Sequence, residues 1–164
     1  LAPAELPEKT LWRAEALALG VAKAFKSPGL FAVELFIDNK EQVLVNETAP
    51  RVHNSGHQSI EGNYCSQFDM LWRILLDYPL GNTNSISSSV MVNLVGEENY
   101  YGQAHYFGLK EVLSMDKTFV HIYGKNETKP GRKMGHVTIL SNDKTELINK
   151  VQEIKQLITV KSLS

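Results

Sequence analysis

The sequence has little cysteine and no long apolar run, and these shortages exclude several classes of protein. The single cysteine, Cys65, provides neither a disulfide framework nor a cysteine-rich metal site. No apolar run approaches the roughly 20 residues that span a bilayer, and the N-terminal segment lacks the pattern of a signal peptide. A formal net charge of -1 gives no basic excess for nucleic-acid binding. We therefore expect a cytoplasmic globular protein that binds neither membrane nor nucleic acid.

Apolar spacing in the first half of the chain predicts helices around a β-hairpin. The first helix begins near Pro7 and ends before the Ser-Pro-Gly turn at 27–29. Two strands, over 30–37 and 42–47, are joined by a short polar turn, and a second helix is expected over about 59–78. This half forms the first expected domain, residues 1–81.

The second half follows a serine- and asparagine-rich stretch, NTNSISSS, which is typical of a linker. It is the second expected domain, residues 82–164, a small β-rich α/β domain. Its last helix is expected over 143–160, with Asp143 as N-cap and Glu146 completing a capping-box-like start. The remaining expected elements are strands over 89–96, 118–124 and 134–141 and a short piece around 108–114. The predicted fold class of the whole chain is α+β.

Two glutamates fall on the neighbouring strands of the expected hairpin, Glu34 within FAVELFI and Glu47 at the end of VLVNE. Each alone fits a solvated strand residue. With an even turn, position 45 lies opposite Glu34, and Glu47 is its diagonal neighbour on the same face, about 7–8 Å away. An odd turn would put the two on opposite faces. Converging carboxylates repel, and Mg²⁺ would relieve the repulsion and accept phosphate oxygens. Strict alternation turns Asn46 to the other face unless a bulge intervenes.

The segment NETAPRVHNSGH, which follows the second strand, gathers directional polar groups. Arg51 can hold a planar anion with two parallel hydrogen bonds, and His53 can exchange a proton near neutral pH. Asn54 offers a short hydrogen-bonding side chain, although it fits a helix-capping turn equally well. We expect Arg51 and His53 to contact a ligand beside the carboxylates.

Two histidines four residues apart, His53 and His57, would share one face of a helix and hold zinc there. Pro50 and Gly56 favour a loop instead, and no accompanying zinc motif is present. We therefore do not expect a zinc site.

A second polar loop, YGKNETKPGRKMGH, lies between two expected strands and contains Lys125 and Arg132. Three further cations, Lys129, Lys133 and His136, lie within or close to it. One interpretation is a solvated hairpin tip. The other is a basic loop that closes over an anionic ligand held by the first domain.

Three segments together resemble a known family: VLVNETAPRVHNSGH with the preceding FAVELF, SQFDMLWRILLDYPLG, and YGKNETKPGRKMGHVTIL. They resemble the C-terminal half of the 5-(carboxyamino)imidazole ribonucleotide synthases, ATP-grasp ligases of purine biosynthesis also known as the ATPase subunit of phosphoribosylaminoimidazole carboxylase. The resemblance covers residues 30–140. It implies half of an ATP-grasp domain, an antiparallel sheet with helices, followed by a small C-terminal domain.

The resemblance implies a reaction in which ATP phosphorylates bicarbonate and the carboxyl group passes to aminoimidazole ribonucleotide. Glu34 and Glu47 would then bind Mg²⁺, and Asn46 and Glu47 would bind ATP. The substrates and carboxyphosphate would be held by Arg51, His53 and Asn54, with Arg51 and His53 in the catalytic roles, and the ribonucleotide phosphate by Lys125 and Arg132. The family also implies a homodimer.

The family's N-terminal substrate domain and glycine-rich ATP-binding subdomain have no counterpart in the sequence. We therefore expect a fragment that is inactive alone. Two alternatives remain open: another ATP-grasp ligase with different substrates, or a non-catalytic nucleotide-binding module.

Overall fold

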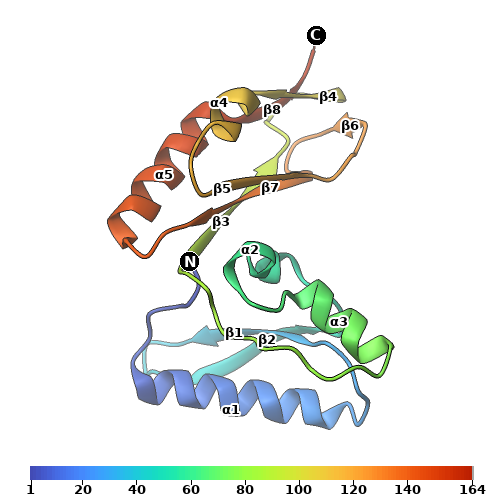
Figure 1. Cartoon of the computed structure of the whole chain (residues 1–164), viewed down its shortest axis with the longest axis vertical. Helices are drawn as coiled ribbons and strands as arrows, with labels where there is room; N and C mark the ends of the chain where they lie inside the picture. The colour runs from blue at the N-terminus through green and yellow to red at the C-terminus, as the bar shows by residue number, and fades with distance from the viewer. Residues whose placement is uncertain (164) are drawn as a thin grey trace. The chain divides into compact units, whose positions relative to one another are not determined.

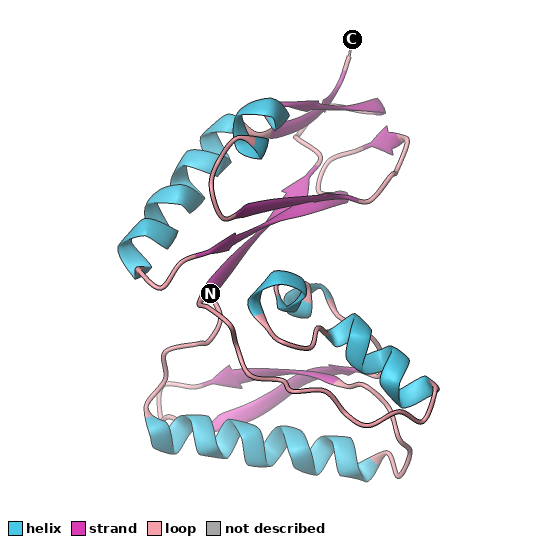
Figure 2. Cartoon of the chain, viewed as in Figure 1, coloured by secondary structure: helices cyan, strands magenta, loops and turns pink. Residues whose placement is uncertain are grey.

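The computed structural model describes residues 1–163 and divides the chain into two compact units. Pro3–Asn84 form the first unit, and Leu1–Ala2 with Ser85–Ser164 form the second. Both units combine helices with antiparallel strands, which confirms the predicted α+β class (Figures 1 and 2). Among the helices of residues 1–163, none has both the length and the apolar character needed to cross a bilayer.

The first unit is built on the hairpin of β1 (Ala32–Ile37) and β2 (Val43–Ala49), against which α1 (Glu8–Ala24) packs. Figure 1 shows α1 along one face of the hairpin. Apolar residues at the two ends of this helix, Leu11 and Phe25, are 41% and 47% exposed. Phe25 instead stacks on Phe31, with ring centroids 4.8 Å apart, and so closes the turn from helix to strand.

The rest of the first unit contains η1 (Asn54–Gly56), α2 (Ser59–Gly62) and α3 (Gln67–Leu75). The prediction of one continuous helix over 59–78 is wrong. Asn63 is extended, and a new helix begins after Ser66, whose hydroxyl accepts the N–H of Asp69. The break brings Gln67 to the start of a helix, where its side chain faces the preceding loop.

The described part of the second unit has strands β3 (Ser89–Val95), β4 (Gly102–Phe107), β5 (Thr118–Ile122), β6 (Glu127–Thr128), β7 (Lys133–Leu140) and β8 (Thr159–Ser162), and helices α4 (Leu109–Leu113) and α5 (Lys144–Leu157). The strands form two three-stranded antiparallel sheets, ordered β3-β7-β5 and β6-β4-β8. The expected strands correspond to β3, β5 and β7, whereas β4, β6 and β8 were not predicted. Helix α5 ends at Leu157, so the part of the expected helix from residue 159 onward is a strand.

The core of the second unit lies where α4 and α5 meet the strands. Central strand β7 is almost wholly buried because it has a neighbour on each side. The fully buried side chains come from helices and sheet alike, and burying each contributes about 1.5–3 kcal/mol. The core residues are Leu94, Val112, Met134, Val137, Ile139, Leu147, Ile154, Ile158 and Val160.

Helix α5 begins as predicted with Asp143, whose carboxylate accepts the N–H groups of Thr145 and Glu146. Glu146 does not complete a capping box. The N–H of Asp143 is donated to the hydroxyl of Ser141, and the Glu146 carboxylate accepts from that same hydroxyl and pairs with Lys150.

The Glu146 carboxylate gives the second unit a pH-dependent stability. Hydrogen bonding by Lys150, and secondarily by Ser141, lowers the pKa of Glu146. A carboxyl whose pKa is lower in the folded chain stabilises fully above its unfolded pKa, and this contribution is lost as pH falls through the folded pKa. We expect Glu146→Gln to lower the urea midpoint at neutral pH and to have less effect at about pH 3. Glu153→Gln, an exposed site on the same helix, is the control; equal effects of Glu146→Gln at both pH values would contradict the prediction.

Candidate functional site

The two predicted metal ligands lie directly opposite each other on the hairpin. Because β1 ends at Ile37 and β2 begins at Val43, the turn spans residues 38–42 and is odd. An odd turn alone would separate the carboxylates. A bulge next to Glu34 shifts the register, so that Leu35 pairs with Val45 but Glu34 pairs with Glu47. The predicted diagonal arrangement is therefore wrong, and the carboxylates face each other more closely than expected.

The extra residue of this bulge is Asn46. Its Nδ2 donates to Oε2 of Glu34 at 3.3 Å, so the amide lies on the face of the carboxylates. A bulged strand places two residues opposite one, which is the condition under which Asn46 can join the site.

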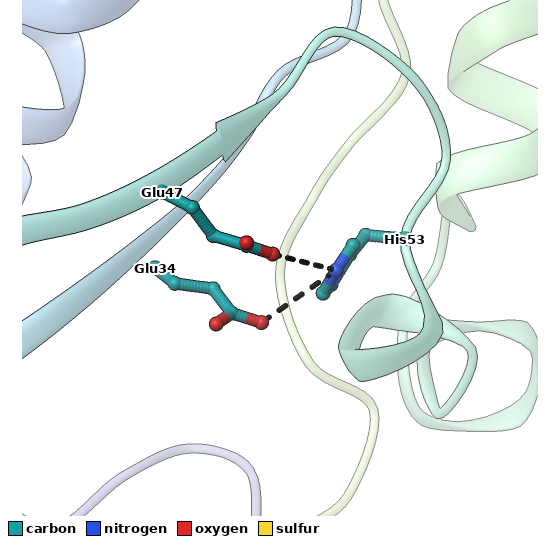
Figure 3. Close-up of side chains that lie close together, drawn as sticks. All are labelled: Glu34, Glu47 and His53. Atoms are coloured by element: carbon teal, nitrogen blue, oxygen red, sulfur yellow. Dashed lines mark ion pairs between the residues drawn. The ribbon is translucent and has the colours of Figure 1, made fainter.

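The loop after β2 brings His53 to the carboxylates. Nε2 of His53 lies 3.5 Å from Oε1 of Glu34 and 3.9 Å from Oε1 of Glu47, as Figure 3 shows. On the other side of the ring, Nδ1 accepts the N–H of Ser55 at 3.4 Å and lies 2.9 Å from its hydroxyl. In the neutral tautomer that this N–H contact favours, Nδ1 is the acceptor and the proton is on Nε2, which faces the carboxylates.

The three groups form a candidate cation site. One ligand atom from each of Glu34, Glu47 and His53 lies within 4.8 Å of the others. The His53 side chain is 15% exposed, whereas those of Glu34 and Glu47 are 42% and 61% exposed. Like charges directly opposite on paired strands destabilise a hairpin, and an oxygen-seeking divalent cation offsets that cost. In the tautomer with the proton on Nε2, the carboxylates are the fitting ligands and the imidazole is a donor beside them.

A residue that sequence reasoning missed, Gln67, holds this loop. Its side-chain amide hydrogen-bonds both the N–H and the carbonyl of His53 at 2.8 Å and lies 2.7 Å from Nδ1 of His57. The signal that could have found it is Ser66-Gln67-Phe68-Asp69, a serine followed three residues later by an acid, which marks a helix start.

Arg51 and Asn54 lie beside His53. The guanidinium of Arg51 donates to the carbonyl of Val52 at 2.9 Å, and Asn54 begins η1. Arg51, His53 and Gln67 share the lining of a cavity of about 170 Å³. Arg51 is exposed, so its remaining N–H groups can reach an anion in this cavity.

In the second unit, Lys125 and Arg132 both lie in the segment that connects β5 to β7, residues 123–132. The ammonium of Lys125 donates to the carbonyl of Lys133, and Nη1 of Arg132 donates to the carbonyl of Glu127 at 2.9 Å. These bonds tie the two cations to the main chain of their own loop. Lys125 also lines a cavity of about 490 Å³ between β4 and this loop.

Both units match families known from other proteins. Residues 1–68 match the ATP-grasp domain, and residues 89–150 match the phosphoribosylaminoimidazole carboxylase C-terminal domain. N5-carboxyaminoimidazole ribonucleotide synthase of Aquifex aeolicus is 39% identical over 153 residues, which cover 93% of this chain and 40% of that protein. Phosphoribosylaminoimidazole carboxylase of Schizosaccharomyces pombe is 38% identical, over 92% of this chain and 28% of its own length.

Solved structures also resemble this chain along almost its whole length. N5-carboxyaminoimidazole ribonucleotide synthetase of Thermotoga maritima is 42% identical, with a TM-score of 0.93 over 99% of this chain and 45% of its own. The Aspergillus clavatus enzyme in complex with ADP and 5-aminoimidazole ribonucleotide is 32% identical, with a TM-score of 0.82 over 94% of this chain and 42% of its own. The chain thus spans less than half the length of these proteins. The expected half of an ATP-grasp domain, followed by a small C-terminal domain, is confirmed.

Proposed function

Because the chain belongs to the N5-carboxyaminoimidazole ribonucleotide synthase family of ATP-grasp proteins, we propose that it forms part of a ligase of purine biosynthesis. This ligase uses ATP and bicarbonate to carboxylate 5-aminoimidazole ribonucleotide. The observation that carries the proposal is the convergence of Glu34, Glu47 and His53 at the bulged end of the hairpin. Activity requires the remainder of an ATP-grasp enzyme, so we expect the 164 residues alone to be inactive.

Glu34 and Glu47 would hold Mg²⁺, since facing carboxylates supply the oxygen ligands that this ion prefers. When bound, the ion would neutralise charge on the phosphates of ATP. Asn46 orients the Glu34 carboxylate through its amide and presents a polar side chain to the nucleotide. The negative charges of the site are therefore positioned before the nucleotide binds.

An apolar surface for the nucleotide base adjoins the carboxylates. Phe36 lies two residues from Glu34 and pairs with Leu44 across the hairpin, so both lie on the face that carries Glu34. Their side chains are 59% and 48% exposed. An aromatic ring beside a phosphate-binding centre suits stacking against adenine.

Arg51, His53 and Asn54 would hold bicarbonate, carboxyphosphate and the imidazole substrate. Arg51 matches the planar shape of bicarbonate with a bidentate hydrogen bond. His53 supplies an N–H beside the carboxylates, where it can hold an anion or relay a proton. A bicarbonate oxygen would attack the γ-phosphorus of ATP as ADP leaves, which forms carboxyphosphate, a mixed anhydride. The substrate amine would then attack the carboxyl carbon, phosphate would leave with the anhydride oxygen, and the amine would give up a proton.

Lys125 and Arg132 would bind the phosphate of the ribonucleotide. Both cations are already ordered by main-chain carbonyls, which reduces the entropy lost when they bind an anion. We further propose that residues 1–81 and 82–164 act as separate domains and that the complete protein is a cytoplasmic homodimer.

The test is a chimera in which this chain replaces the matching segment of the Thermotoga maritima protein. Release of ADP and carboxylation of the ribonucleotide are measured with and without bicarbonate. We expect ADP release that depends on both bicarbonate and 5-aminoimidazole ribonucleotide. A folded chimera without this activity contradicts the proposal. Stimulation by another amine in place of the imidazole would point to a different ATP-grasp ligase.

A further inference from the structure

The side chain of Gln67 is fixed in one orientation by its partners. The N–H of His53 can only donate and its carbonyl can only accept, so Oε1 of Gln67 takes the first and Nε2 serves the second, each at 2.8 Å. The second hydrogen of Nε2 then points to Nδ1 of His57, 2.7 Å away. Nδ1 of His57 is therefore an acceptor, and the proton of the neutral ring is on Nε2.

The surrounding loop leaves this amide little freedom. The hydroxyl of Ser59 donates to the carbonyl of Gly56 at 2.6 Å and accepts the N–H of Gln67 at 3.0 Å. Gly56 lies against the amide so closely that an added Cβ would meet Oε1 of Gln67 at 2.8 Å. Gln67 thus closes the loop that starts at His53, and Gly56 and Ser59 of this loop hold Gln67 in turn.

The position of the His53 ring follows from its main chain. Gln67 holds that main chain extended, with φ −127° and ψ 148°, and Ser55 holds Nδ1 of the ring. Because the main chain of His53 and Nδ1 of its ring are both held, Nε2 lies against the carboxylates of Glu34 and Glu47. Without the amide, the main chain of His53 loses two hydrogen bonds and the ring can turn away.

We propose that Gln67 is a positioning residue, which keeps Nε2–H of His53 directed at Glu34 and Glu47 by fixing the His53 main chain. Its effect on the reaction rests on the proposed function, whereas its effect on the two histidine rings does not. No other side chain of this size offers one acceptor and two donors in the same plane, which explains a glutamine at this position.

The first test uses the 164-residue chain and histidine ¹H–¹⁵N correlation spectra, which report the protonated ring nitrogen. We expect His57 to carry its proton on Nε2 in the unmodified chain. In Gln67→Glu, an oxygen replaces the donor, and we expect the His57 proton to move to Nδ1. In Gln67→Leu, we expect loss of the nuclear Overhauser contacts between the His53 ring and the side chains of Glu34 and Glu47. Gln152→Leu, at an exposed position of α5, should retain them.

A proton on Nδ1 of His57 in the unmodified chain would overturn the proposal, even if every variant failed to fold. So would a folded Gln67→Leu chain that keeps the His53 contacts. In the chimera, we expect Gln67→Leu to lower kcat about 10- to 100-fold with KM for ATP changed less than about threefold. A general loss of folding would instead reduce the amount of active protein, so kcat is expressed per folded chimera, with the folded fraction measured by circular dichroism. An inactive unmodified chimera with the expected tautomers would refute the proposed function alone.

Discussion

Glu47→Gln is expected to remove nearly all ligase activity from the chimera. Glutamine keeps the shape of the side chain but not the charge that would bind Mg²⁺. We expect kcat/KM to fall about a thousandfold, with a higher Mg²⁺ concentration needed for half-maximal rate. Initial rates of ADP formation, measured across a Mg²⁺ titration, test this.

The matched control is Glu41→Gln, which makes the same charge change in the turn of the same hairpin, outside both strands. We expect its activity to remain within about twofold of the unmodified chimera. If both variants lose activity equally, the loss reflects the charge of the hairpin and not a metal ligand. An active Glu47→Gln chimera would remove the central part of the proposed function.

Gly108→Ala is expected to be the most destabilising single methyl addition in the second unit. Gly108 precedes α4 with φ 73°, a left-handed conformation that costs other residues about 1–2 kcal/mol. In addition, its Cβ would overlap the carbonyl oxygen of Leu157 at the end of α5. The atoms nearest the added Cβ belong to the main chain of Leu157 and Ile158, so the overlap is relieved only if α4 and α5 separate. We expect the free energy of unfolding to fall by about 2–5 kcal/mol in total. Urea unfolding followed by circular dichroism measures it.

Gly124→Ala separates the cost of the left-handed backbone conformation from the cost of the overlap with Leu157. Gly124 also has a positive φ, 68°, but an added Cβ would meet nothing within 4 Å. We therefore expect only the conformational cost of about 1–2 kcal/mol there. Equal losses at the two positions would show that the contact between Gly108 and Leu157 does not matter.

The sequence could predict the carboxylate pair but not its register. Alternating apolar residues place Glu34 and Glu47 on neighbouring strands, and that prediction needs only local patterns. Their registration depends on the turn length and on the bulge at Asn46, neither of which alternation reveals. The prediction of a shared face is confirmed, although for a different reason from the one expected.

Sequence patterns do not reveal Gln67, because its partner His53 is 14 residues away and the apolar spacing predicts one helix over 59–78 that includes Gln67. Local propensity does not report such a contact. The same limit applies to β8, where the apolar spacing of α5 continues past its end at Leu157 and hides a strand of alternating burial. The roles of all the site residues remain predictions, since they concern ligands. These residues are Glu34, Asn46, Glu47, Arg51, His53, Asn54, Lys125 and Arg132.

Consecutive residues of a regular strand face opposite ways, so side chains on one face recur only about every 6.6 Å. The bulge in β2 breaks this alternation, so that Asn46 and Glu47, which are neighbours in the chain, both place their side chains on the face of Glu34. Two of the groups proposed to bind ligand are therefore one residue apart in the chain, where a regular strand would need two. A ladder without that extra residue could keep the two acids together, but it would have no amide beside them.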